Sequence, residues 1–134
     1  MALSKDRNTL LKAGDLHSDP VAANTRIFAG ALMCLDASGN AVPGATATDL
    51  VARGRADEHI DNTDGAAGDQ RIRSSRGVFC FDNSADADEI TRAHIGSDAY
   101  IVDDHTVAAT DGTGTRSIAG RIDDVDSAGV WVAI

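Results

Sequence analysis

Aromatic side chains are scarce in this sequence, at 4% of 134 residues. The core must therefore be built from small aliphatic side chains, chiefly alanine and valine. Such side chains bury little apolar area each, at about 25 cal/mol per Å². We therefore expect a single domain that is only modestly stable alone and that gains stability from a partner or an oligomer.

Basic residues are scarce as well, since 12 Lys and Arg stand against 21 Asp and Glu, for a net charge of −9. Nucleic-acid binding depends on neutralising phosphates with basic side chains, so this balance argues against a nucleic-acid partner and against an anionic membrane surface. The chain also lacks an apolar run of about 18 residues and the pattern of a secretion signal. We expect neither a membrane span nor secretion by a recognisable signal.

Motifs that announce enzyme chemistry are missing. Cys34 and Cys80 lie in apolar runs without CxxC spacing, which predicts buried free thiols in a reducing compartment. No HxxxH or HxH spacing supports a zinc site, and no GxSxG motif marks a nucleophile. The sequence therefore predicts no enzyme activity, no cofactor and no metal site. The four histidines are His17, His59, His94 and His105.

The many acidic residues raise the question of a calcium site. If Gly65 takes the invariant sixth position of a calcium loop, Ile60 and Arg71 take the first and twelfth positions, and neither is a calcium ligand. The other acidic clusters are expected to be solvated turn residues, with a calcium ion gathered from several turns as the alternative. These clusters are Asp86/Asp88/Glu89, Asp103/Asp104 and Asp123/Asp124/Asp126.

A glycine-rich segment at residues 109–120, ATDGTGTRSIAG, approaches the fingerprint of a dinucleotide-binding loop. That fingerprint works only where a helix N-terminus follows the glycines and faces the pyrophosphate. The residues that follow here, SIAGRI, are β-branched and contain Gly120, which predicts a strand. We expect a flexible connection between strands rather than a phosphate site.

Short apolar runs alternate with Gly, Asp, Asn and Ser clusters along most of the chain, which is typical of an all-β domain. We predict a single small β-barrel or β-sandwich over residues 21–134 and one short helix over residues 87–96, capped by Ser84 or Asp86 and ended by Gly96. The predicted strand segments are residues 26–36, 50–60, 70–81, 98–104, 106–110, 117–125 and 130–134.

Aspartates mark the ends of several of these strands, where their side chains are expected to open turns. Two such turns, DASGNAV and DSAGVWV, predict hairpins in which Gly39 and Gly129 adopt a positive φ. The run at residues 27–35 is apolar on both faces, so each face must be covered. We expect a barrel interior on one face and a neighbouring subunit on the other.

The first twenty residues are polar and lack alternation, which predicts an extended N-terminal arm over residues 1–20, with a short helix between Ser4 and Gly14 as the alternative. Beyond the arm, arginines at spacing two predict a basic stripe that pairs with carboxylates of a partner or a neighbouring subunit. Solubilising charge on an outer sheet face is the alternative. The arginines are Arg53, Arg55, Arg71, Arg73 and Arg76.

The whole chain resembles a family of head decoration, or cement, proteins of tailed bacteriophages, of the kind found with Mu-like heads. The resemblance lies in the ordered series KDRNT, PVAANTRIFAGALMCLDASGNAVPG, VARGRADEHIDNTDG, RSSRGVFCFDNS and the segment from DEITRAHIG to GVWVAI. It implies a protein made in the host bacterial cytoplasm that binds the outer capsid surface as a homotrimer at three-fold positions. It would clamp neighbouring major capsid subunits there.

The predicted partner contacts are therefore the five arginines and the arm residues Lys5, Asp6, Arg7, Asn8 and Thr9. Two other functions stay open: a virion-surface module for a sugar or host receptor, and a calcium-dependent accessory domain. The first would need an exposed aromatic platform, and we expect Tyr100, Trp131 and the three Phe side chains to lie inside apolar strands.

Overall fold

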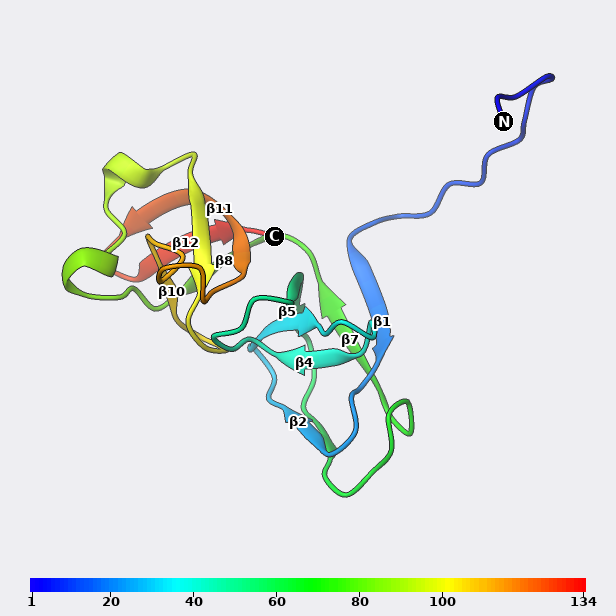
Figure 1. Ribbon diagram of the computed structural model, residues 1–134, viewed down its shortest axis with the longest axis horizontal. Helices are drawn as coiled ribbons and strands as arrows, with labels where there is room; N and C mark the ends of the chain where they lie inside the picture. Colours follow the sequence, from blue (N-terminus) through cyan, green and yellow to red (C-terminus); the bar gives the residue numbers. More distant parts are fainter.

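The computed structural model describes residues 1–134 and is mostly β, as predicted, with two 3-10 turns and no α-helix (Figure 1). Its strands fall into two five-stranded sheets and one two-stranded ribbon, and the sheets are not closed into a barrel. The strands are β1 (Leu16–Pro20), β2 (Thr25–Ile27), β3 (Leu32–Leu35), β4 (Ala41–Pro43), β5 (Val51–Ala56), β6 (Ile60–Asn62), β7 (Arg71–Ser75), β8 (Val78–Phe81), β9 (Asp98–Ile101), β10 (Val107–Ala108), β11 (Ile118–Asp126) and β12 (Gly129–Ala133).

The first sheet has the strand order β1-β7-β5-β3-β4, and the ribbon β2-β6 packs beside it. Alternation decides which side chains of β7 are buried: Ile72 and Ser74 face inward, whereas Arg71 and Arg73 are exposed. The buried side of this half of the molecule is a small core. Its members are Val21, Ile27, Ala31, Met33, Ala41, Ala56 and Ile72.

The second sheet has the order β10-β9-β11-β12-β8, and all its strand pairs are antiparallel. A single parallel bridge, between Asp82 after β8 and Thr106 before β10, connects the two edges of this sheet. The larger core lies against this sheet and contains residues of the first sheet too. It consists of Leu32, Cys34, Phe81, Ile90, Ala99, Ile101, Val107, Ala119, Ile122, Val130 and Val132.

Strand β3 joins the two cores. Leu32 and Cys34 lie in the larger core, and Met33, which points to the other face, lies in the smaller one. The prediction of two covered faces is therefore confirmed, but the predicted covering subunit is wrong for this strand. Both faces are covered within the chain, because the β2-β6 ribbon and the second sheet pack on opposite sides of β3.

Both predicted hairpins are present, with Gly39 at φ +82° and Gly129 at φ +144°. The Asp36 carboxylate accepts hydrogen bonds from the backbone N–H groups of Ser38 and Asn40, at 2.9 and 3.0 Å. Asp126 accepts one from Ala128 at 2.8 Å in the same way. The prediction that aspartates open turns is thus confirmed at these two sites.

The predicted helix over residues 87–96 is wrong. The segment forms two separate 3-10 turns, Asp86–Asp88 and Arg92–His94, and the extended residues between them bring Ile90 into the larger core. The Asn83 side chain holds Ile90 there, since its amide and carbonyl bond the O and N–H of Ile90 at 2.8 and 2.9 Å. Burial of one isoleucine therefore prevails over local helix propensity.

The N-terminal segment is irregular only through Asp15, because residues 16–20 form β1 and pair with β7. Residues 1–15 contain no helix, including between Ser4 and Gly14, and they extend away from the β body in Figure 1. We call residues 1–15 the arm. Its base is fixed by one hydrogen bond, from the Arg76 N–H to the Asp15 carbonyl at 2.8 Å.

Candidate interaction surfaces

The arm exposes apolar side chains to solvent. Leu3, Leu10 and Leu11 are 75%, 88% and 97% exposed. The predicted contact residues on the arm are exposed too, and none of them forms an ion pair with the body. They are Lys5, Asp6, Arg7, Asn8 and Thr9. The arm therefore presents an unpartnered segment of mixed basic and apolar character.

Arg71 and Arg73 share the exposed face of β7, as the spacing predicted. Both side chains already have partners in the chain. The Arg71 guanidinium donates to the hydroxyl and carbonyl oxygens of Ser18 on β1, and Arg73 pairs with Glu58 at 2.7 Å. Most of this basic charge is therefore neutralised or hydrogen-bonded locally, and the same holds for the pair on β5.

Arg53 and Arg55 do not form a matching pair, because a bulge lies between them. Residues Cys34 and Met33 of β3 oppose Ala52 and Gly54, so Arg53 has no cross-strand partner. Arg53 instead binds both carboxylate oxygens of Asp19 at 2.9 and 3.1 Å.

Arg55 pairs with Asp57 at 2.9 Å and lies 4.8 Å from the centre of the Phe79 ring. Arg76, the last predicted contact on the body, is exposed and has no carboxylate within ion-pair distance. Its side chain makes only a long 3.5 Å hydrogen bond to the Ile134 carbonyl. Among the five predicted arginines, Arg71 and Arg76 form no ion pair, and Arg76 is the less constrained of the two, because Arg71 also donates two hydrogen bonds to Ser18.

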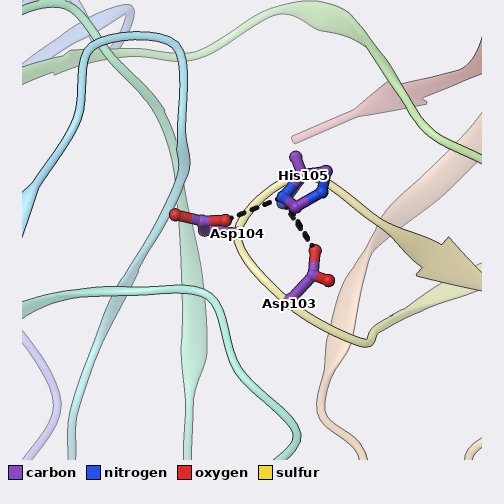
Figure 2. Close-up of side chains that lie close together, drawn as sticks. All are labelled: Asp103, Asp104 and His105. Atoms are coloured by element: carbon purple, nitrogen blue, oxygen red, sulfur yellow. Dashed lines mark hydrogen bonds and ion pairs between the residues drawn. The ribbon is translucent and has the colours of Figure 1, made fainter.

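Only one cluster of side chains has the spacing of a metal site, at the turn after β9. Figure 2 shows Asp103 and Asp104 converging on the imidazole of His105, whose Nδ1 lies 3.2 and 2.9 Å from their carboxylate oxygens. The Asp103 carboxylate also accepts the backbone N–H of His105 at 3.0 Å. The position between the carboxylates is thus filled by the imidazole, and the cluster offers few of the six to eight oxygens that calcium takes.

This cluster gives a prediction about protonation. The hydrogen bond to Asp104 and the charge of Asp103 raise the pKa of His105 above its usual 6.5. Protonated His105 therefore stabilises the folded state below pH 6.5, and this contribution is lost as the pH rises through the raised pKa. We expect Asp104→Asn to lower the pKa of His105, measured by NMR titration of the imidazole protons. Asp98→Asn is the control, and equal shifts in the two variants would contradict the assignment.

The glycine-rich segment is followed by strand β11, not by a helix, so the predicted strand after the glycines is confirmed. The segment is more tightly held than the predicted flexible connection. Arg116 binds both carboxylate oxygens of Asp88 at 3.1 and 3.2 Å and donates to the Thr110 carbonyl. The hydrogen bonds that Asp88 accepts from Arg116 and, to a smaller extent, from the Thr110 hydroxyl lower the pKa of Asp88.

Two further predictions about side-chain environment are corrected. Cys34 is buried, and burial raises its pKa to about 12, but Cys80 is exposed, because it lies on the outer face of edge strand β8. Phe28 is 53% exposed rather than inside a strand. Its ring stacks on His59 at 5.1 Å and carries the Arg26 guanidinium at 4.7 Å.

A groove of about 600 Å³ lies between the two sheets and was not foreseen from the sequence. One wall comes from the start of β5 (Leu50, Val51 and Ala52) and the other from β11 and Tyr100 of β9. Val51 and Ile118 are 61% and 50% exposed on these walls, although both are strand residues of apolar character. We call this feature the inter-sheet groove.

Comparison of the chain with protein-family models, with characterised proteins and with solved structures finds no match. No helix in the structure has the length and apolar character needed to cross a membrane. The geometry of the chain itself identifies two candidate interaction surfaces, the arm and the inter-sheet groove. Both expose apolar side chains on a chain that is otherwise rich in surface charge.

Proposed function

We propose that this chain is a structural virion protein that binds the outer surface of a tailed-phage capsid and clamps neighbouring major capsid subunits. We propose further that it does so as a homotrimer at three-fold positions, without catalysis, cofactor or nucleic-acid contact. The observation that carries this proposal is the arm, in which basic and apolar side chains are exposed together. The sequence resemblance to head decoration proteins supports it.

The arm suits a clamp for a physical reason. Ordering an exposed segment costs conformational entropy, so the arm needs a partner surface to bury its leucines and pair its charges. Contacts of Lys5 and Arg7 with carboxylates would set the register of the arm on a capsid subunit. In a trimer, one bound arm raises the effective concentration of the other two, so modest contacts add up to firm attachment.

The exposed Arg76 at the arm base extends this surface onto the body, since its backbone N–H holds Asp15 in place. The paired arginines of β5 and β7 would exchange internal partners for capsid carboxylates at little net gain, because exposed ion pairs contribute roughly 0–1 kcal/mol each. We therefore assign capsid contact first to the arm and Arg76, and only then to Arg53, Arg55, Arg71 and Arg73.

Deleting residues 1–14 is the test of this assignment. Before Asp15 the arm forms no backbone hydrogen bond and no ion pair with its own body, so the truncated chain is expected to keep its β fold, as checked by circular dichroism. Its affinity for expanded capsids is expected to fall by about tenfold or more, as measured by co-sedimentation. Unchanged capsid binding would contradict the assignment of the arm.

A matched pair of variants separates sequence-specific contact from general charge. Lys5→Ser/Arg7→Ser and Arg92→Ser/Arg121→Ser each remove two positive charges, the first from the arm and the second from the body. We expect only the arm variant to weaken capsid binding. Equal weakening in both would show that net charge, and not the arm, determines attachment.

A further inference from the structure

We propose that the inter-sheet groove is the receptor for Leu10 and Leu11 of a second copy of this chain, so that neighbouring copies exchange arms. This inference concerns the proposed self-association and is independent of capsid binding. It assigns the arm two successive contacts. Residues 5–9 remain free for the capsid, while the leucine pair nearer the body occupies the neighbouring copy.

The first support is the match between two unpartnered apolar features. The leucine pair is 88% and 97% exposed, and the groove exposes Val51 and Ile118. Successive side chains of an extended chain point in opposite directions. A chain lying along the groove would direct Leu10 to one wall and Leu11 to the other, so that a two-walled groove accommodates two adjacent leucines.

The second support is charge. The arm holds three basic and two acidic residues, whereas residues 16–134 hold nine basic and nineteen acidic ones. Lys12 follows the leucine pair directly, and the exposed carboxylate of Asp111 lines the groove beside Arg116, whose charge is balanced by Asp88. Attraction between the basic arm and the acidic body of another copy favours the encounter and sets its direction.

The third support is position. The arm base and the groove rim are bound to two consecutive residues, Arg76 and Gly77. At the arm base, the Arg76 N–H donates to the Asp15 carbonyl at 2.8 Å, and at the groove rim, the Ile134 N–H donates to the Gly77 carbonyl at 2.9 Å. Asp15 lies four positions after Leu11, which gives the leucine pair a reach of about 14 Å from the arm base. The arm leaves its own body in a direction away from the second sheet (Figure 1), which favours a neighbouring groove over its own.

Arm exchange also fits a closed ring. The donated arm and the accepting groove are different surfaces, so the contact between copies is head-to-tail. Head-to-tail contacts close into rings when the rotation between copies permits it, and a trimer is one such ring. Each copy then both gives and receives an arm, which leaves no leucine pair or groove exposed.

Cross-linking between two distinguishable copies tests the proposal without capsids. One chain carries Cys80→Ser and Leu11→Cys, and the other carries Cys80→Ser, Ile118→Cys and an affinity tag that shifts its mass. Cys80 is removed because it is exposed, whereas Cys34 is buried and stays. After mild oxidation of the mixture, we expect a disulfide-linked product that contains both chains. Leu3→Cys, on a leucine 75% exposed, is the control and should give about tenfold less product.

A second measurement uses light scattering. The double variant Leu10→Ser/Leu11→Ser is expected to weaken self-association by about a hundredfold relative to the full chain, because two leucines lose their burial. A folded body in that variant, checked by circular dichroism, separates lost association from unfolding. A further variant carries Cys80→Ser, Leu11→Cys and Ile118→Cys on one chain. Three results would overturn the proposal: a monomeric full chain, equal cross-linking from Leu3→Cys and Leu11→Cys, or a disulfide formed only within the chain in this further variant. Such a disulfide would place the arm in its own groove.

Discussion

Leu32→Ala is expected to lower the free energy of unfolding by about 2–5 kcal/mol, the range for truncating a fully buried leucine. Leu32 is 0% exposed and lies on β3, the strand that both cores share. Its loss opens a cavity between the first sheet and the second, in the core that also contains Phe81, Ile90 and Ile101. Because a domain of this size is only marginally stable, such a loss is a large fraction of its free energy of unfolding.

Denaturant unfolding of Leu32→Ala beside Leu16→Ala measures this effect. Leu16 is 70% exposed on β1, so the same truncation there is expected to change the free energy of unfolding by less than about 0.5 kcal/mol. An unchanged slope with a lower midpoint for Leu32→Ala would show that the variant keeps its fold and loses stability. Equal midpoints for the two variants would contradict the shared core.

Gly54→Ala is expected to destabilise the protein by about 3–5 kcal/mol, through backbone strain and overlap together. Gly54 has φ +153° at the bulge of β5, a conformation that side chains with a Cβ rarely adopt. An added Cβ would also overlap the carbonyl oxygen of Ser75 on the neighbouring strand β7. Both penalties arise at the bulge, where the backbone of β5 lies close to the backbone of β7.

Gly30→Ala separates the two penalties. Gly30 has φ +88°, but an added Cβ there would meet no atom within 4 Å. We expect it to cost about 1–2 kcal/mol, from the positive φ alone. Thermal or denaturant melts of the two variants should therefore differ by the overlap at Gly54, and equal losses would show that the close approach of β5 and β7 is not tight.

The sequence predicts the strands well wherever one short stretch determines the outcome. The two-sided apolar run through Met33 correctly required a cover on each face, and the Asp and Gly of DASGNAV correctly specified a hairpin. What covers β3 could not be predicted, because both covering layers depend on strands far along the chain, β6 in the ribbon and β8 to β12 in the second sheet. Whether the sheets close into a barrel could not be predicted either, because closure depends on how the two edge strands of the second sheet, β8 and β10, meet near Asp82.

Contacts between distant residues explain the other differences. Arg53 binds Asp19, which lies 34 positions earlier, and Arg116 binds Asp88, 28 positions earlier. No spacing rule links such pairs, so a basic stripe was expected where the fold neutralises most of the charge. The predicted helix failed for a related reason, since Asn83 and the larger core fix Ile90 in an extended conformation.

Of the two candidate surfaces, one could be predicted from the sequence and the other could not. The exposure of the arm follows from its polar, unpatterned sequence and could be predicted. The inter-sheet groove could not, because Val51 and Ile118 look like ordinary strand residues. Their exposure follows from the open groove that both residues line between β5 and β11.

The most direct measurement of the proposed function is co-sedimentation of the purified full chain with expanded tailed-phage capsids that lack a decoration protein. We predict saturable binding at micromolar protein, with the bound chain in multiples of three at saturation. The same amount of protein in the pellet with and without capsids would contradict the proposal that this chain is a capsid clamp.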